Sequence, residues 1–280
     1  MVKRKRLLNA TNIEEHISQG FGQGRGCDYK PWLVVRDVPS VGVSSRVKGW
    51  TTNRVHELFS QLELRYFYLL DWSVLVADIR EQYPLLPLEE TQEIAQQLNI
   101  RHPANPRTKD PIVMTTDFVV TVNQSIGVTE QARTVKPKEK LSSARVLEKL
   151  EIERRYWQGR GISWGIVTEN EISKAFADNV AWIHPFRHPS SLSLTEIEIE
   201  QISYVLTQQV MQTDTPLAAI TTDCDNQLGL PPGTSLCVAR HLLASRHWIV
   251  DMNRAIQPRE PLLLLKVSPQ VSELQMGEVG

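Results

Sequence analysis

The sequence has few cysteines and no long apolar run. Cys27, Cys224 and Cys237 are the three cysteines among 280 residues, and their odd number and wide spacing argue against a disulfide framework and fit a reducing compartment. No stretch approaches the roughly 18 unbroken apolar residues of a membrane-spanning helix. The basic start of the chain is followed by no long apolar core, so it does not resemble a secretory signal. We therefore expect a soluble, cytoplasmic protein without a membrane partner.

Several familiar catalytic signatures are also missing. The sequence contains no Walker glycine loop, no dinucleotide-binding fingerprint and no Ser-His-Asp arrangement. It has no Cys-x2-Cys pair, so we interpret Cys237 and His241, with Cys224 and His247, as core and surface residues and not as zinc ligands. The net charge of -1 says nothing about nucleic acid by itself, because DNA binding depends on where the positive charges lie.

Positive charge is concentrated near the start of the chain. The first six residues are mostly cationic, and a glycine-rich turn with a further arginine follows them. A flexible basic arm of this kind is able to contact DNA phosphates, and a solvated terminal tail is the plainer alternative. The candidate DNA-contacting residues are Lys3, Arg4, Lys5, Arg6 and Arg25.

The length favours two domains, and the hydrophobic pattern changes near residue 170. In residues 1–170 the pattern predicts helices at 54–70, 91–98 and 142–158, and strands at 74–80, 112–122, 128–135 and 163–168. The short link between 112–122 and 128–135 favours an antiparallel hairpin. This order of elements indicates an α/β fold in which a mixed sheet is flanked by helices.

Residues 171–280 have a more helical character. The pattern predicts helices at 171–182, 196–211, 216–228 and 233–245, and two strands at 248–252 and 261–266 that could pair. Helices followed by a terminal β-ribbon indicate a winged-helix domain.

Three residues of the first domain suggest a catalytic site. Asp117 interrupts a strand rich in valine, although aspartate is a poor strand former, and Lys136 ends the next strand. Glu63 has Phe59 and Phe67 as its neighbours four residues away, so a helix would place its carboxylate beside aromatic rings. A buried carboxylate needs a partner, and either a divalent cation or a salt bridge, for example to Arg65 or from a neighbouring strand, would supply one.

These residue types fit metal-dependent hydrolysis of a phosphodiester. Carboxylates from separate elements bind Mg2+ and leave room for water and phosphate, while an ammonium group orients or deprotonates water and offsets negative charge. Glu153 is a fourth candidate, as a metal ligand or a supporting residue, because Leu150 and Trp157 flank it at helical spacing. Its membership in a charged helix face is an equally good explanation.

Six segments, in order, resemble the TnsA family of transposon endonucleases. They are GRGCDYKPWL (24–33), RVHELFSQLEL (54–64), DIREQYPL (78–85), TTDF (115–118), VKP (135–137) and LEKLEIERRYW (147–157). The resemblance implies a restriction-endonuclease-like catalytic domain in residues 1–170 and a winged-helix domain in residues 171–280. On this sequence the catalytic residues of the family fall on Glu63, Asp117 and Lys136, with Glu153 as an additional acidic position.

The same resemblance implies an activity and partners. TnsA-like subunits cut double-stranded DNA at the 5' ends of a bacterial transposon, with two Mg2+ ions per site for which Mn2+ substitutes. A TnsB-like transposase cuts and joins the 3' ends, and a TnsC-like ATPase regulator contacts the carboxy-terminal region. Such a protein would act at the bacterial nucleoid.

One position departs from the family pattern, which commonly has Gln or Glu two residues before the lysine. This chain has Thr134, whose hydroxyl is a poorer metal ligand than a carboxylate. We expect metal binding through the Val135 backbone carbonyl, Asp117 and Glu63 instead, and hence activity despite Thr134. Two other functions stay open: a stand-alone restriction or repair nuclease, and a catalytically silent DNA-binding adaptor.

Overall fold

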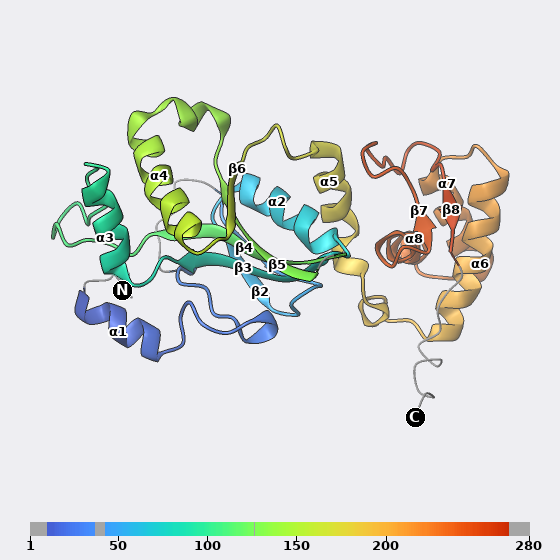
Figure 1. Ribbon diagram of the computed structural model, residues 1–280. Helices are drawn as coiled ribbons and strands as arrows, with labels where there is room; N and C mark the ends of the chain where they lie inside the picture. Colours follow the sequence, from blue (N-terminus) through green and yellow to red (C-terminus); the bar gives the residue numbers. More distant parts are fainter. Residues whose placement is uncertain (1–9, 37–42, 126, 269–280) are drawn as a thin grey trace. The chain divides into compact units, whose positions relative to one another are not determined.

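The computed structural model describes residues 10–36, 43–125 and 127–268 (Figure 1). The chain forms two compact units, Met1–Ile172 and Ser173–Gly280. Within the described residues, no helix is both long enough and apolar enough to cross a membrane.

A four-stranded mixed sheet, in the order β3-β4-β5-β6, forms the centre of the amino-terminal unit (Figure 1). β3 (Val76–Pro84) and β5 (Gly127–Val135) pair antiparallel with β4 (Thr115–Gln124) on either side of it. β6 (Ser163–Val167) pairs parallel with β5, because helix α4 (Ala144–Gly159) connects them as a crossover. The predicted hairpin and the predicted mixed sheet flanked by helices are confirmed, and this architecture fits a nuclease fold.

Helices cover the sheet and bury its apolar side chains. In Figure 1, α4 lies above the strands, α1 (Ala10–Ser18) lies below them and α3 (Leu88–Gln97) lies at one end, while α2 (Gln61–Trp72) packs against β2 (Val55–Leu58), β3 and β5. The main core cluster joins the sheet to α3 and α4 and comprises Leu85, Ala95, Met114, Val119, Ala132, Ile152, Tyr156 and Trp157. A smaller cluster fixes the amino-terminal segment and comprises Ile13, Phe21, Trp32 and Leu88.

The predicted helix at 54–70 is wrong in its first part. Val55–Leu58 forms strand β2, paired antiparallel with β1 (Ser45–Lys48), and the helix begins only at Gln61. Ser60 is the N-cap, because its side chain accepts a hydrogen bond from the Glu63 backbone N–H. The next strand also differs from prediction, since β3 continues through Tyr83 and Pro84, where we expected it to stop.

The carboxy-terminal unit is mainly helical. Its elements are α5 (Lys174–Ile183), α6 (Glu196–Gln212), α7 (Leu217–Leu228), α8 (Thr234–Ala244), β7 (Trp248–Ile249) and β8 (Lys266–Val267). A capping box between Thr195 and Glu198 begins α6, and Gly229, at φ 64°, ends α7 in the left-handed conformation. The predicted helices are confirmed, and the predicted strand pair is present but much shorter than expected. Short 3-10 turns occur at Gly26–Asp28, Lys138–Ser142, His184–Phe186 and Pro189–Ser191.

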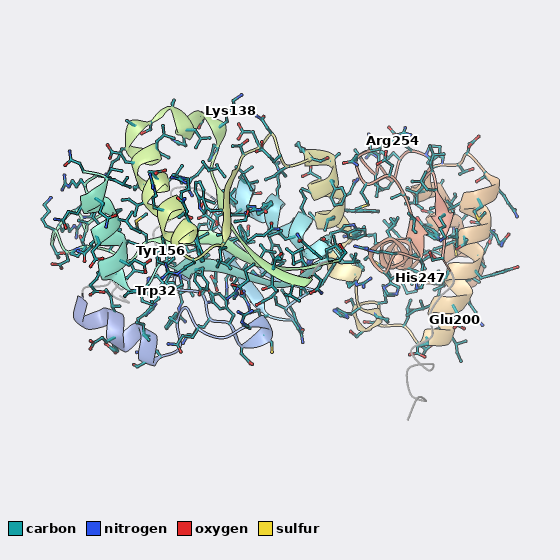
Figure 2. All side chains as sticks on the ribbon, in the orientation of Figure 1. Trp32, Lys138, Tyr156, Glu200, His247 and Arg254 are labelled. Atoms are coloured by element: carbon teal, nitrogen blue, oxygen red, sulfur yellow. The ribbon has the colours of Figure 1, made fainter. Side chains whose placement is uncertain are left out.

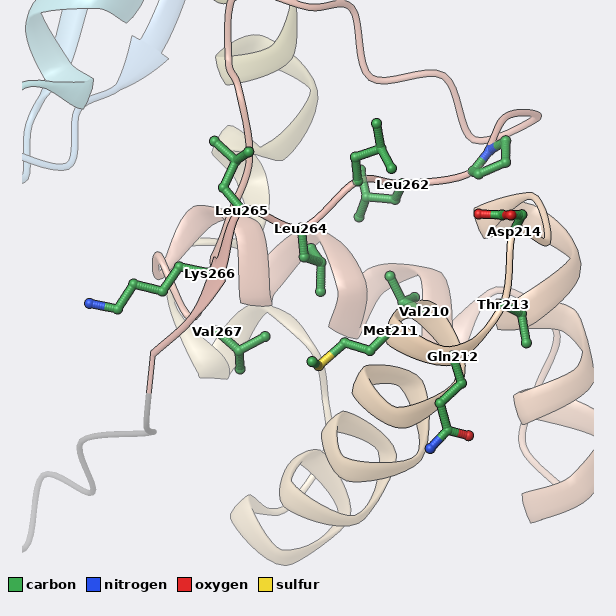
Figure 3. A pocket seen from close by; sticks show the side chains of 12 residues that line it. Val210, Met211, Gln212, Thr213, Asp214, Leu262, Leu264, Leu265, Lys266 and Val267 are labelled. Atoms are coloured by element: carbon green, nitrogen blue, oxygen red, sulfur yellow. The ribbon is translucent and has the colours of Figure 1, made fainter.

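A groove of about 330 Å³ lies in this unit, between the end of α6 and residues 261–267 (Figure 3). Val210, Met211, Leu264 and Val267 contribute apolar side chains to its lining. The groove contains none of the candidate catalytic residues, all of which belong to the amino-terminal unit.

Candidate active site

The structure brings Asp117 and Lys136 together, as predicted. Asp117 lies on β4 and is buried, and its Oδ2 accepts hydrogen bonds from the Val135 backbone N–H at 2.7 Å and from Lys136 Nζ at 2.8 Å. The Lys136 backbone N–H donates to the Val167 carbonyl at 2.9 Å, so the residue is held just beyond the paired strands β5 and β6. The lysine side chain is 34% exposed and is therefore accessible from solvent.

Glu63 lies in the first turn of α2 and belongs to the same site. Its Oε2 accepts hydrogen bonds from the Phe59 backbone N–H at 3.0 Å and from Gln82 Nε2 at 3.4 Å, and its Oε1 accepts one from the Ser60 hydroxyl at 2.9 Å. Phe59 therefore precedes the helix and supplies a backbone donor, where we had expected it to contribute an aromatic neighbour within the helix. The side chain is nonetheless buried.

The electrostatics show that the candidate residues act on one another. Burial, together with the negative charge of Asp117, raises the pKa of Glu63 to about 7. Burial alone would lower the pKa of Lys136, but the neighbouring Asp117 carboxylate outweighs it and raises that pKa. A buried carboxyl group whose pKa is raised by burial and by a neighbouring carboxylate is a candidate for a functional site.

Glu153 is buried on α4 and contacts both central strands. Its Oε1 accepts hydrogen bonds from the Thr116 hydroxyl at 2.7 Å, from Trp164 Nε1 at 3.1 Å and from the Thr134 hydroxyl. Burial raises the pKa of Glu153, while the bonds from Thr134 and Thr116 favour its charged form. The Thr134 side chain is thus used to stabilise a neighbouring carboxylate.

The oxygen atoms at this site suit a hard divalent cation. Among the described residues, no three His, Cys, Asp or Glu side chains gather closely enough to form a metal-binding group. Cys237 and His241 are therefore not part of such a group either. Magnesium, however, is usually held by one or two protein carboxylates together with water and substrate oxygens. Glu63, Asp117 and the Val135 carbonyl would meet that requirement, although Lys136 Nζ also donates to this carbonyl at 3.0 Å.

Of the proposed DNA-contacting residues, the structure describes Arg25 alone. Lys3, Arg4, Lys5 and Arg6 lie outside the described residues. Arg25 follows three glycines with positive φ, and its side chain is 65% exposed while it forms a salt bridge with Glu130 at 2.8 Å. Arg25 is thus accessible, but one of its partners is an acidic side chain.

A buried polar network next to the site was missed by sequence reasoning. Glu81, on β3, accepts hydrogen bonds from Arg54 at 2.8 and 2.5 Å, from His56 Nδ1 at 2.7 Å and from the Glu57 backbone N–H at 3.0 Å. The network joins β2 to β3, directly before Gln82, which contacts Glu63. Its members lie within two of the segments that carry the family resemblance, 54–64 and 78–85, and this location was the sequence feature that could have drawn attention to them.

Comparisons with known proteins agree with this geometry. Residues 75–169 match the family model described as TnsA-like endonuclease N terminal, and residues 171–252 match the one described as TnsA endonuclease C terminal. The chain is also 41% identical over 210 residues to the Transposon Tn7 transposition protein TnsA of Escherichia coli, which covers 75% of each chain. The chain therefore belongs to the TnsA family of transposon endonucleases.

Proposed function

We propose that this protein is a Mg2+-dependent DNA endonuclease that cuts the 5' ends of a transposon, with Glu63, Asp117 and Lys136 as its catalytic residues. The relative from Escherichia coli is named as a transposition protein, and transfer of that role to this chain supports cut-and-paste transposition as the setting. The single observation that carries the proposal is the shared site, in which Lys136 Nζ lies 2.8 Å from Asp117, and burial together with the Asp117 charge raises the pKa of Glu63.

Asp117, Glu63 and the Val135 carbonyl are the proposed cation ligands, with Asp117 central and Glu63 available to a second ion. When bound, Mg2+ or Mn2+ neutralises charge on the scissile phosphate and lowers the pKa of a coordinated water. Glu153 is the remaining acidic candidate. Its contacts with Thr116 and Thr134 favour a supporting role in holding β4, which carries Asp117, and β5, which Lys136 directly follows.

Lys136 serves as a fixed positive charge in this proposal. Because Asp117 raises its pKa, the ammonium group stays protonated at neutral pH. A protonated lysine does not act as a general base, but it orients the attacking water and offsets negative charge on the phosphate. Of the two roles that the sequence left open, the geometry therefore favours charge stabilisation.

The remaining parts of the chain would bind DNA and partners. We assign the amino-terminal unit a restriction-endonuclease-like fold and the carboxy-terminal unit a winged-helix fold, since its helices are followed by a short strand pair. Arg25 would contact a DNA phosphate. A TnsB-like transposase and a TnsC-like ATPase are the proposed partners, and the bacterial nucleoid is the proposed place of action.

The test is cleavage of a labelled transposon end, with the partner transposase and Mg2+ present. Wild type should cut the 5' strand, while Asp117→Ala should lose this cut and leave the 3' cut intact. Asp223→Ala, at an exposed position on α7, is the matched control and should behave as wild type.

Two results would favour the alternatives. Efficient cutting by the purified chain without the transposase would indicate a stand-alone nuclease. An Asp117→Ala variant with both cuts unchanged would indicate a DNA-binding adaptor without catalytic function, and would refute the assignment.

A further inference from the structure

Gln82 is a side chain of the site that neither the chemistry above nor the sequence patterns explain. It lies on β3 between Glu81 and Tyr83, which pair with Phe118 and Thr116, so its neighbour on β4 is Asp117. Its side chain is buried. A long polar side chain in such a place needs partners for its amide, since an unsatisfied buried amide is costly.

Both ends of the Gln82 amide have a partner. Nε2 donates to Glu63 Oε2 at 3.4 Å, and Oε1 accepts the Thr115 hydroxyl proton at 3.3 Å. The amide nitrogen is assigned to the Glu63 side, because there it donates to a carboxylate oxygen while Oε1 accepts the hydroxyl proton of Thr115. Gln82 thus connects the Glu63 carboxylate on α2 to the beginning of β4, two residues before Asp117.

The contact from Gln82 differs in kind from the other two that Glu63 receives. Phe59 N–H and the Ser60 hydroxyl lie immediately before α2 and belong to the helix cap. Within the described part of the chain, the hydrogen bond from Gln82 links this carboxylate to the central sheet, where Asp117 lies. A contact between the two elements fixes the carboxylates relative to each other, which a contact within the cap does not do.

The backbone of Gln82 is held in a conformation that glutamine rarely adopts. Its φ is 49°, in the left-handed region, although it lies within a strand. The Gln82 carbonyl accepts the Trp32 N–H at 3.2 Å, and Trp32, labelled in Figure 2, belongs to the smaller core cluster. The amino-terminal segment also contacts the strand residues before and after Gln82. Tyr29 donates its hydroxyl proton to the Glu81 carbonyl at 3.1 Å. Gly22 lies so close to Pro84 that a Cβ added to the glycine would be 2.4 Å from Pro84 Cγ.

From these contacts we infer that Gln82 is a positioning residue of the nuclease site, which holds the Glu63 carboxylate in place beside Asp117 for cation binding. The inference rests on the proposed function, because it assigns Glu63 and Asp117 to one cation-binding site. The amino-terminal segment fixes the strained Gln82 backbone, and the backbone directs the amide at Glu63. Strained residues of this kind persist where surrounding structure holds them, and they cluster at functional sites.

Two substitutions that differ in how readily they adopt a positive φ test the inference. Gln82→Met keeps the length of the side chain and disfavours a positive φ as glutamine does, so it loses only the amide. Gln82→Gly also loses the amide, but it adopts a positive φ readily. If the amide matters, both variants bind the cation more weakly. Gln96→Met, at an exposed position on α3, is the control.

The first measurement is Mn2+ binding to the purified full chain, followed by water proton relaxation without DNA or partners. We expect the dissociation constant to rise by about 10-fold or more in both Gln82 variants, as is usual when a residue supporting a metal ligand is lost. The second is 5' cleavage with the transposase, where the half-saturating Mg2+ concentration should rise by a similar factor. The rate at saturating Mg2+ should stay within about 3-fold of wild type, because a positioning residue touches no reacting atom.

The outcomes separate this inference from the proposed function. Wild-type Mn2+ affinity in both Gln82 variants overturns the inference, and so does weakening in Gln82→Met alone, which would indicate a packing effect. A loss of cleavage that saturating Mg2+ does not restore overturns it as well. Asp117→Ala measured in parallel tests the site itself: if that variant keeps both Mn2+ binding and 5' cleavage, the proposed function fails first.

Discussion

Two glutamates of the amino-terminal unit have similarly lowered pKa values in opposite surroundings. Burial opposes the ionisation of Glu81, but His56 and Arg54 more than compensate and lower its pKa to about 2. On the surface of α4, hydrogen bonds from Arg154 and Arg155 outweigh slight desolvation and also lower the pKa of Glu151 to about 2. The Glu81 side chain is 0% exposed and that of Glu151 is 33% exposed. Replacement of each glutamate by Gln therefore compares the contribution of a buried ion pair to stability with that of a partly exposed one.

The structure gives the expected size of each effect. For Glu81, a fall in pKa from 4.5 to about 2 corresponds to about 3 kcal/mol of stability at neutral pH. The Glu81→Gln change also leaves Arg54 buried with a weaker partner, and breaking a buried pair in this way costs about 3–5 kcal/mol. For Glu151, solvent screening reduces the effect, so Glu151→Gln should cost less than about 1 kcal/mol.

The pH dependence has a definite sign. Because the pKa of Glu81 is lower in the folded state than in the unfolded chain, its stabilisation is fully present above pH 4.5 and is lost as the pH falls towards about 2. Gln does not titrate, so the difference between wild type and Glu81→Gln should be largest at neutral pH and should shrink across this window.

Urea unfolding at a series of pH values measures both effects. We expect the midpoint to fall much further for Glu81→Gln than for Glu151→Gln at pH 7, and the two curves for wild type and Glu81→Gln to converge on acidification. Equal costs for the two variants at pH 7, or a difference that does not change with pH, would refute the reasoning from burial.

Three further predictions concern the site and the carboxy-terminal unit. Thr134→Ala should retain 5' cleavage in the transposition assay and lose about 1 kcal/mol of stability, because Glu153 loses one hydrogen-bond donor; complete loss of cutting would show that the hydroxyl acts in catalysis. Lys136→Met should lower the 5' cleavage rate by about 100-fold or more without weakening end binding in a gel-shift assay, and an unchanged rate would exclude the lysine from the mechanism. Thr195→Ala should lower the unfolding free energy by about 1 kcal/mol through loss of the α6 capping box; Thr222→Ala, at an exposed position within α7, should have little effect.

The central hairpin was predictable because its signal is local. The strands β4 and β5 are rich in β-branched side chains and a short turn separates them, so their antiparallel pairing followed from the pattern. Asp117 stood out against that pattern, and the pairing of its strand with the next one placed Lys136 near it. A charged residue that departs from a clear strand pattern is a signal that one sequence does provide.

The start of α2 shows how a correct pattern leads to a wrong boundary. Val55, Leu58 and Leu62 follow helical spacing, and we extended the helix over all of them. The signal for the true boundary was present in Ser60 and Glu63, which have the spacing of a capping box. Apolar spacing over a few residues does not distinguish a buried strand from a helix, and in such cases the cap decides.

The contacts that connect distant segments had no local signal. Arg54 and Glu81 are far apart in sequence, and Gln82, which contacts Glu63, has a positive φ within a strand. Neither propensity nor periodicity predicts such a conformation, because tertiary contacts impose it. The candidate residues Glu63, Asp117 and Lys136 could thus be proposed from the sequence, whereas the contacts of Arg54 with Glu81 and of Gln82 with Glu63 required the structure.

Thr134 illustrates the same distinction at the one position where this chain departs from the family pattern. A glutamate there would bring a second carboxylate against Glu153, which is buried and already has a raised pKa. The threonine hydroxyl instead donates to Glu153 and adds no negative charge. Thr134 and Glu153 are thus mutually compatible, and a residue that looked like a defect in the metal site is explained by its neighbour on α4. In the proposed site the cation ligands are Glu63, Asp117 and the Val135 carbonyl, and the proposed placement of Glu63 by Gln82 is then the more important.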